Sequence, residues 1–298
     1  SRILSQAMCE AIRGCGGIFL GFKKRNHSGL DLDRLKSELT MNQHYYTDLS
    51  DSEWQIIEEL QKDNRKRKYS LRSIWNALFY IGRSGCPWRL LPRDFPSWEI
   101  VWYYYRTWRN RGLYQRVMDR LRERVRQKAG RKAEPTVGII DSQCVKASCQ
   151  PMSAKPGEGR GFDGFKKVKG RKRHLVVDTL GLVLVVFVHS AQMADTVGAI
   201  ELFRRLNARF HRLIKVFADQ GYQSSLPKWV ACSCNWMLEI VQKQPGKGFN
   251  VLPKRWVVER TFAWLDTHRR LARDYEQTPI SHEAFVKIAM IRLCLKRL

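Results

Sequence analysis

Acidic residues are scarce in this chain. Aspartate and glutamate number 28 among 298 residues, against 54 lysines and arginines, which leaves a formal net charge of +26 and a pI of about 10.1. A basic excess of this size indicates a polyanionic partner, and nucleic acid is the commonest one. The same charge also suits a merely soluble basic protein of ribosomal type, because net charge bears on partners and says nothing about chemistry.

Long apolar runs are missing as well. A membrane-spanning helix needs roughly 18 or more uncharged apolar residues, and the longest such run here, 180–188, has the length of a buried strand. Near the N-terminus, Glu10 and Arg13 interrupt the apolar residues, so the pattern of a signal peptide is not met. We therefore expect no membrane partner.

The cysteines lack the spacing of a zinc site. None of the eight forms a Cys-x-x-Cys pair, and the closest two, Cys232 and Cys234, are separated by one residue. That gap is unusual for zinc ligands. Scattered cysteines of this kind are typical of a reducing compartment, so we expect a cytoplasmic protein.

Three of the few acids stand where different kinds of element can bring them together. Asp141 and Asp219 each end an apolar, strand-like run, and Glu259 lies early in a helix-like stretch from 255 to 265. Two strands and a helix can place three carboxylates at one point on the edge of a sheet. Hard oxygen ligands in a strongly basic protein indicate Mg²⁺ held against a phosphodiester.

The chain divides into three parts: an extension at 1–40, a helical module at 41–132 and a catalytic domain at 133–298. A chain of this length suits one large or two modest domains. The extension is rich in loop-forming residues. Met41 is either the natural start, with upstream sequence before it, or the residue after a genuine extra helix at 30–39; both interpretations stay open.

The module at 41–132 has the pattern of four helices. Ser50 or Ser52 can cap the first, Ser70 the second, the third begins near Ser97, and the fourth follows Gly112. Short helices with basic, aromatic-rich faces are typical of a helix-turn-helix-like module that binds DNA. Its candidate phosphate contacts are Arg106, Arg109 and Arg111. The alternative is that the aromatic residues are core and the arginines are solvated.

Strand and helix patterns alternate after residue 136. Strands are expected at 136–142, 173–178, 182–189, 213–218 and 236–241, and helices at 194–209 and from about 255 and 281. A segment rich in glycine, proline and lysine, 151–170, is expected to be a loop. Strands first and then strands mixed with helices predict an α/β fold with helices packed on the sheet.

Cations gather next to the proposed site. The candidate DNA contacts in this part of the chain are Lys146, Lys166, Lys167, Lys169, Arg171, Lys172 and Arg173. A charge run is usually a solvated loop, but this one adjoins the proposed active-site hairpin, so we predict that it grips phosphates. We interpret His174 as a hydrogen-bonded structural residue, Asp178 as a turn residue and Asp195 as an acid at a helix N-terminus.

A series of segments, in order along the chain, resembles the DDE transposases of bacterial insertion sequences, in the small-element group near insertion sequence five. The segments are 47–54, 85–92, 141–146, 169–181, 219–222 and 255–265. The resemblance covers about residues 45–298. It implies a ribonuclease-H-like catalytic domain, with Asp141, Asp219 and Glu259 as the catalytic residues that hold two ions of Mg²⁺ or Mn²⁺.

The function that the resemblance implies is that of a transposase. Such a protein binds the terminal inverted repeats of its insertion sequence and catalyses metal-dependent strand cleavage and strand transfer. Water first frees a 3′-hydroxyl at the element end, and that hydroxyl then attacks target DNA. The implied partners are double-stranded DNA, at the element ends and the target, and a second copy of the chain in a homodimer on DNA. The implied location is the bacterial nucleoid.

Some positions depart from the family pattern. Arg255 fits the arginine four residues before the last acid, but Leu252 and Asp266 stand where the family often has tyrosine and lysine, and Cys144 where serine is commoner. Arg269 or Arg270, one helical turn beyond, is the expected substitute for the lysine. The gap from Asp219 to Glu259 is 259 − 219 = 40 positions, which leaves no room for the large β insertion of some related transposases.

Two further functions stay open. One is a catalytically silent DNA-binding protein derived from a transposase, which the departures around the last acid favour. The other is a structure-specific nuclease of the ribonuclease H type, which the helical module disfavours.

Overall fold

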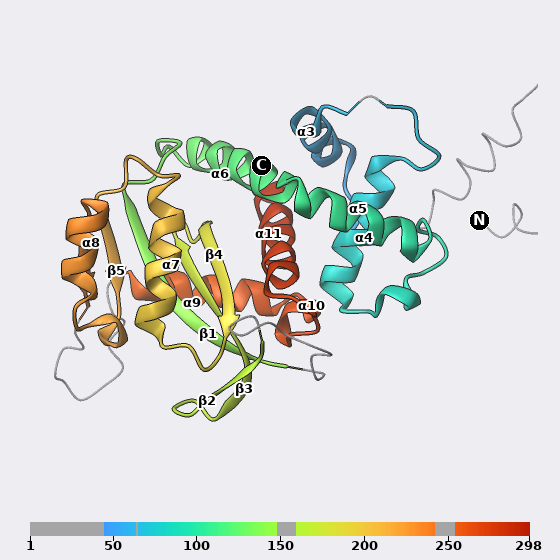
Figure 1. Cartoon of the computed structure of the whole chain (residues 1–298). Coiled ribbons are helices and arrows are strands. Elements are labelled where there is room, and N and C mark those ends of the chain that lie inside the picture. The colour runs from blue at the N-terminus through green and yellow to red at the C-terminus, as the bar shows by residue number, and fades with distance from the viewer. Residues whose placement is uncertain (1–44, 64, 148–158, 242–253) are drawn as a thin grey trace, which may run out of the picture. The chain divides into compact units, whose positions relative to one another are not determined.

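Four helices precede the sheet in the described part of the chain. The computed structural model describes residues 45–63, 65–147, 159–241 and 254–298; the expected extension at 1–40 and Leu252 lie outside them. The helices are α3 (Asp51–Gln61), α4 (Leu71–Ser84), α5 (Trp98–Asn110) and α6 (Leu113–Lys128) (Figure 1). The four predicted helices are confirmed. Ser50 caps α3 in a capping box with Glu53, and the hydroxyl of Ser70 accepts the first-turn N–H that begins α4.

A six-stranded mixed sheet follows. Its strands are β1 (Val137–Lys146), β2 (Gly161–Asp163), β3 (Val168–Val177), β4 (Val183–Ser190), β5 (Lys215–Ala218) and β6 (Met237–Ile240). The strand β3 is antiparallel to β1, β2 and β4, while β5 is parallel to β1 and β6 is parallel to β5. The predicted α/β class and its five strands are confirmed. β2 lies in the segment predicted as a loop, because three residues in glycine- and lysine-rich sequence give no strand signal.

The β2–β3 hairpin folds back over β1. In the register, Cys144 pairs with Lys172 of β3, whereas Asp163 pairs with Val168, beyond the end of β1. Even so, the Cys144 thiol donates a hydrogen bond to the Asp163 carboxylate at 3.1 Å. Gly170 allows this curl, since a Cβ at that position would lie 1.9 Å from the carbonyl oxygen of Val145.

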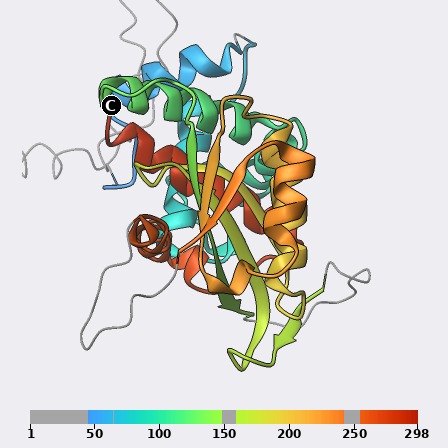
Figure 2. The ribbon, with the colours of Figure 1, turned by 90° about the vertical axis from the view of Figure 1, so that its left-hand side faces the viewer.

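Helices cover both faces of the sheet. α7 (Asp195–Asn207) and α8 (Leu226–Cys234) pack on one face, and α9 (Arg255–Asp266) and α11 (Pro279–Leu295) on the other (Figure 2). Successive residues of β1 show the division, since Ile139 lies in the core with α9 and α11 and Ile140 in the core with α7 and α8.

The helix α11 joins the sheet to the first four helices. It packs on β4, α4 and α6, so most of its residues are buried (Figure 1). Two polar contacts strengthen the junction: Arg292 pairs with Glu53 of α3 at 2.8 Å, and Arg126 of α6 pairs with the buried Asp178. The short α10 (Arg269–Ala272) lies between α9 and α11. Within the described ranges, no helix is both long and apolar enough to cross a bilayer.

Candidate active site

Two of the three predicted acids lie on neighbouring strands, Asp141 within β1 and Asp219 just past the end of β5. The parallel pairing of β1 with β5 aligns Ile139 with Phe217, and two residues further on the strands lead to Asp141 and Asp219. Asp219 directly follows β5, and its carboxylate accepts the N–H of Gly221 at 2.9 Å, which opens the turn η2 (Gln220–Tyr222). The sheet register therefore brings together carboxylates that are 78 positions apart (219 − 141 = 78).

The environment of Asp141 disfavours its charge. The pKa of Asp141 is raised from 3.8 to about 6: burial is the largest cause and the charge of Asp219 acts in the same direction, while an N–H from Ser142 and the cations Arg255 and Lys166 partly offset them. A half-buried carboxylate beside a second carboxylate is costly for the fold on its own. A cation bound beside the pair would reduce this cost. Carboxylates whose pKa is shifted in this way are common at functional sites.

The third acid, Glu259, lies on α9, and an arginine of the same helix links it to Asp219. Arg255, one turn earlier on the helix, places Nη2 3.4 Å from Oδ2 of Asp219 and Nε 3.4 Å from Oε1 of Glu259. The Glu259 side chain is 56% exposed. The guanidinium of Arg255 thus links the carboxylate of the helix to that of the strand.

The donor set suits a hard divalent cation. Asp141 and Asp219 offer carboxylate oxygens on neighbouring strands, and the pKa of Asp141 is raised. Oxygens of this kind are the ligands that hard divalent cations prefer. As the side chains lie, no three His, Cys, Asp or Glu side chains of the described residues are close enough together to form a metal site. Arg255 lies between Glu259 and Asp219, 3.4 Å from a carboxylate oxygen of each. The chemistry of the three carboxylates fits a hard divalent ion.

Seven of the predicted DNA contacts are exposed. They are Arg106, Arg111, Lys146, Lys166, Lys167, Lys169 and Arg269. Arg106 stacks on the half-exposed ring of Trp102, 4.7 Å from its centroid, and Lys166 reaches the carbonyl of Ser142 at 3.4 Å. Arg109 is half-buried and donates to Ser281 Oγ at 2.5 Å. Their contact with DNA stays a prediction, as does that of Arg255.

Four predicted DNA contacts are buried, which corrects that interpretation. Their ion pairs are Arg171 with Asp274 at 2.9 Å, Lys172 with Asp195 at 3.0 Å, Arg173 with Asp266 at 2.9 Å and Arg270 with Glu276 at 2.7 Å. Residues 171–173 belong to β3, which has strands on both edges and helices on both faces, and Arg270 belongs to α10, which packs against α4, α9 and α11. Their charges stabilise the fold and cannot reach a phosphate from inside it.

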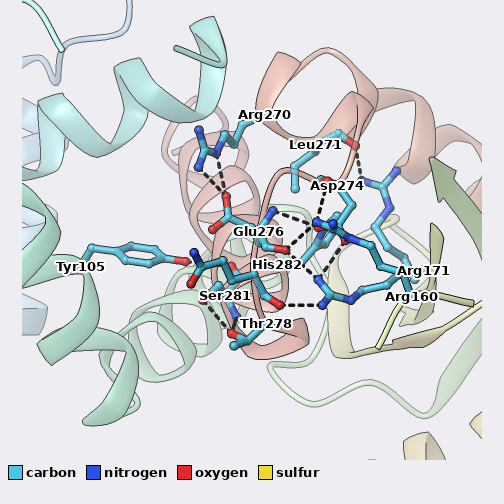
Figure 3. Close-up of polar contacts among 12 residues, drawn as sticks. Tyr105, Arg160, Arg171, Arg270, Leu271, Asp274, Glu276, Thr278, Ser281 and His282 are labelled. Atoms are coloured by element: carbon cyan, nitrogen blue, oxygen red, sulfur yellow. Dashed lines mark hydrogen bonds and ion pairs between the residues drawn. The ribbon is translucent and has the colours of Figure 1, made fainter. Parts of the chain in front are cut away.

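Asp274 is the centre of a buried polar cluster that sequence reasoning missed. Arg171 donates to it at 2.9 Å and His282 at 3.0 Å, and Arg160 lies 3.5 Å away (Figure 3). Burial alone would raise the pKa of Asp274, but the hydrogen bond and charge of His282 and the two arginines lower it below its usual value. The cluster ties β3 to the start of α11. No local pattern reveals it, because Arg171 and Asp274 are 103 positions apart.

The other interpretations of single residues fit their surroundings. His174 is fully buried, and its Nδ1 lies 2.7 Å from Nε2 of His189, as expected of a hydrogen-bonded structural residue. Asp178 accepts the N–H groups of Leu180 and Leu182 in the turn between β3 and β4. Asp195 is the first residue of α7.

The segment that forms the sheet and carries the three carboxylates matches a known protein family. Residues 132–294 match the family described as "Transposase DDE domain", and residues 49–118 match the one described as "Putative transposase of IS4/5 family". Because the first match spans more than half of the chain, the chain belongs to the DDE transposase domain family.

A relative named "Putative transposase for insertion sequence element IS402", from Burkholderia cepacia, is 30% identical over 132 residues. The matched stretch covers 42% of this chain and 63% of the relative. This chain therefore spans less than two thirds of the length of the relative that it matches. The resemblance stated on sequence motifs is confirmed by these matches.

Proposed function

We propose that this protein is a transposase that binds the terminal inverted repeats of an insertion sequence and catalyses metal-dependent cleavage and transfer of DNA strands. The observation that carries the proposal is the placement of Asp141 and Asp219 at matching positions of neighbouring parallel strands, with Glu259 linked to Asp219 through Arg255 of α9. These residues lie inside the segment that matches the transposase DDE domain.

We infer that the catalytic part has a ribonuclease-H-like fold. The support is the strand order β4-β3-β1-β5-β6, in which the first three strands are antiparallel and β5 and β6 run parallel to β1. In this arrangement the first acid lies on the central part of the sheet and the second at the end of the neighbouring parallel strand. α9 then brings the third acid from the face.

Asp141, Asp219 and Glu259 would hold the divalent ions, Mg²⁺ or Mn²⁺ and two in number. DDE transposases generally use such ions. Bound there, the ions activate the attacking oxygen and stabilise the leaving one. The chain's own contribution is positional: the register of β1 and β5 sets the spacing of two carboxylates, α9 presents Glu259, and Lys166 at Ser142 offers a cation for the phosphate.

The DNA would be held by exposed cations of two parts of the chain, the N-terminal helices and the first strands of the sheet. Arg106 and Arg111 lie on and after α5, and Lys146, Lys167 and Lys169 lie near the β2–β3 hairpin. We propose that the helices α3–α6 act as the DNA-binding module for the element ends. The net charge of +26 supports a polyanionic partner. Two copies would act together on DNA in the bacterial nucleoid.

A second candidate is a catalytically silent DNA-binding protein derived from a transposase. The observation that favours it is that Arg255 pairs with both Asp219 and Glu259, so that a cation of the chain itself occupies the acids that would hold an ion. Asp266, where the family often has lysine, is engaged with Arg173 and Gln143.

Cleavage of a matching element end separates these candidates. A labelled duplex that carries the inverted repeat is incubated with Mg²⁺ and the wild-type protein, or with Asp141→Ala, Asp219→Ala or Glu259→Ala. We expect that each variant loses cleavage and still binds the end, because the acids serve the ions and not the DNA backbone. Ile214→Ala, at the opposite end of β5, is the control that keeps both. A wild-type protein that binds the end and never nicks it would favour the silent protein.

A further inference from the structure

The β2–β3 hairpin holds a phenylalanine almost entirely in solvent. Residues 164–167 form its turn, here called the hairpin tip, and Phe165 in that turn is 95% exposed. Phe162 on β2 is 57% exposed. Burying a phenylalanine side chain is one of the larger apolar gains available to a protein. Two such side chains left outside on one hairpin therefore indicate a partner surface.

The exposure of Phe165 is fixed by the turn itself. Asp163 Oδ1 accepts the N–H of Phe165 at 3.0 Å and that of Lys166 at 2.9 Å. Its other oxygen accepts from the Cys144 thiol at 3.1 Å and lies 3.2 Å from Lys172 Nζ. Burial would raise the pKa of Asp163, but these hydrogen bonds and the charge of Lys172 lower it well below its usual range. A buried, ionised carboxylate thus anchors the turn and presents its apolar ring outward.

The hairpin tip lies beside the candidate active site. Lys166 Nζ is 3.4 Å from the carbonyl oxygen of Ser142, the residue after Asp141. The charge of Lys166 also lowers the pKa of Asp141, which places the two side chains within electrostatic reach. Figure 1 shows β2 and β3 projecting beyond the helices that cover the sheet. A ligand bound at these carboxylates would therefore contact the hairpin tip.

The chemistry around the ring matches a nucleic acid. Lys166, Lys167 and Lys169 are exposed, and Lys169 stands directly opposite Phe162 in the hairpin register. An aromatic ring among lysines fits a nucleobase with its neighbouring phosphates, since the ring stacks on the base while the cations hold the backbone. The apolar surface of a protein partner would not call for three lysines around the ring.

We propose that the hairpin tip is a DNA wedge, in which Phe165 stacks on an unpaired nucleobase next to the scissile phosphate while Lys166 and Lys167 hold the flanking phosphates. The wedge rests on the proposed function, because it needs DNA at the carboxylates. Its role is to keep one nucleotide out of the helix stack and so expose the phosphodiester. Phe165 is then a positioning residue of the hairpin tip, separate from the acids.

The test compares two labelled duplexes of one arbitrary sequence, fully paired or with a central mismatch, by fluorescence anisotropy at fixed salt without divalent metal. We expect the wild-type protein to prefer the mismatched duplex by about tenfold, within the range of base–aromatic stacking. Phe165→Ala should lose this preference and keep its affinity for the paired duplex. Phe165→Trp and the control Ile214→Ala, whose residue is 64% exposed at the far end of β5, should keep it.

A second readout follows the base itself. With 2-aminopurine in the mismatch, the wild-type protein should quench the fluorescence by stacking, and Phe165→Ala should not. Wild-type protein that binds both duplexes equally, or a Phe165→Ala variant that still discriminates and quenches, would overturn the wedge while leaving DNA binding intact. Wild-type protein that binds neither duplex would overturn the proposed function and the wedge with it. Because Phe165 is 95% exposed, we expect unchanged thermal unfolding in Phe165→Ala.

Discussion

Arg255 Nη2 lies 3.4 Å from Oδ2 of Asp219, the residue that directly follows β5. The same guanidinium reaches Glu259 on its own helix, also at 3.4 Å. A positive charge supplied by the chain therefore stands between two of the three acids. A divalent ion and Arg255 would compete for the same carboxylate oxygens, because each is favoured by the same negative charge.

Arg255→Gln is therefore expected to bind Mn²⁺ more tightly than the wild-type protein, by roughly fivefold. That factor corresponds to about 1 kcal/mol, the upper part of the range for partly exposed ion pairs. Isothermal titration calorimetry without DNA measures it. Arg260→Gln is the matched control, because Arg260 stacks on Trp256 and Trp264. Weaker Mn²⁺ binding by Arg255→Gln would instead mean that the arginine organises the acids for the ion.

Asp141→Asn is expected to stabilise the protein in the absence of metal. The pKa of Asp141 is raised from 3.8 to about 6, so the folded state binds a proton between these values that the unfolded state has released. The stability that depends on this proton is lost as the pH rises through about 4 to 6. At pH 8 the asparagine avoids a cost of at most about 3 kcal/mol, and at pH 4 the gain falls to about 0.5 kcal/mol.

Urea unfolding in a chelator, at pH 4 and pH 8, measures the gain. Glu201→Gln is the control, since Glu201 pairs with Arg205 on the outer part of α7. If Asp141→Asn were no more stable than the wild-type protein at pH 8, the charge of Asp141 would not destabilise the metal-free protein.

Local signals predicted most of the fold. Ser50 and Ser70 cap the helices that their sequence context indicates, and apolar runs mark the strands that carry Asp141 and lead to Asp219. The caps and the apolar runs depend on residues within a few positions of one another, which is why sequence patterns reveal them. The elements that carry the three acids, two strands and a helix, suggested a shared site.

Features built from distant residues could not be predicted. The charge run that contains Arg171 and Arg173 has the composition of a solvated loop, yet β3 continues through it, and its counterions, Asp274 and Asp266, come from about a hundred positions later. The link from Arg255 to Asp219 likewise exists only once α9 lies against the sheet edge. Long-range ion pairs leave no periodic trace in a single sequence.

Arg171 and Lys169 provide a matched pair that separates structural from DNA-binding cations. Arg171→Ala is expected to lower the free energy of unfolding by about 3–5 kcal/mol, because it removes a partner of the buried Asp274. Lys169→Ala, two residues away and exposed, should leave stability unchanged. It should weaken DNA binding and reduce the slope of log affinity against log salt by about 0.9, the share of one phosphate contact.

Urea unfolding and anisotropy titrations over a range of salt concentrations measure both variants. Similar losses of stability in the two would contradict the burial of Arg171, and an unchanged salt slope in Lys169→Ala would remove Lys169 from the DNA contacts.

The last prediction concerns assembly on DNA. We expect two protomers to pair the two ends of an element before either end is cut, because a requirement for both ends prevents a break at a lone one. Isolated chains are then monomeric and dimerise on a fragment that carries an end repeat. Light scattering coupled to size-exclusion chromatography gives the mass with and without this fragment. Asp141→Asn should assemble as the wild-type protein does without cutting, which lets the complex be weighed intact. A complex that keeps one protein per DNA end while the wild-type protein cuts both strands would contradict pairing.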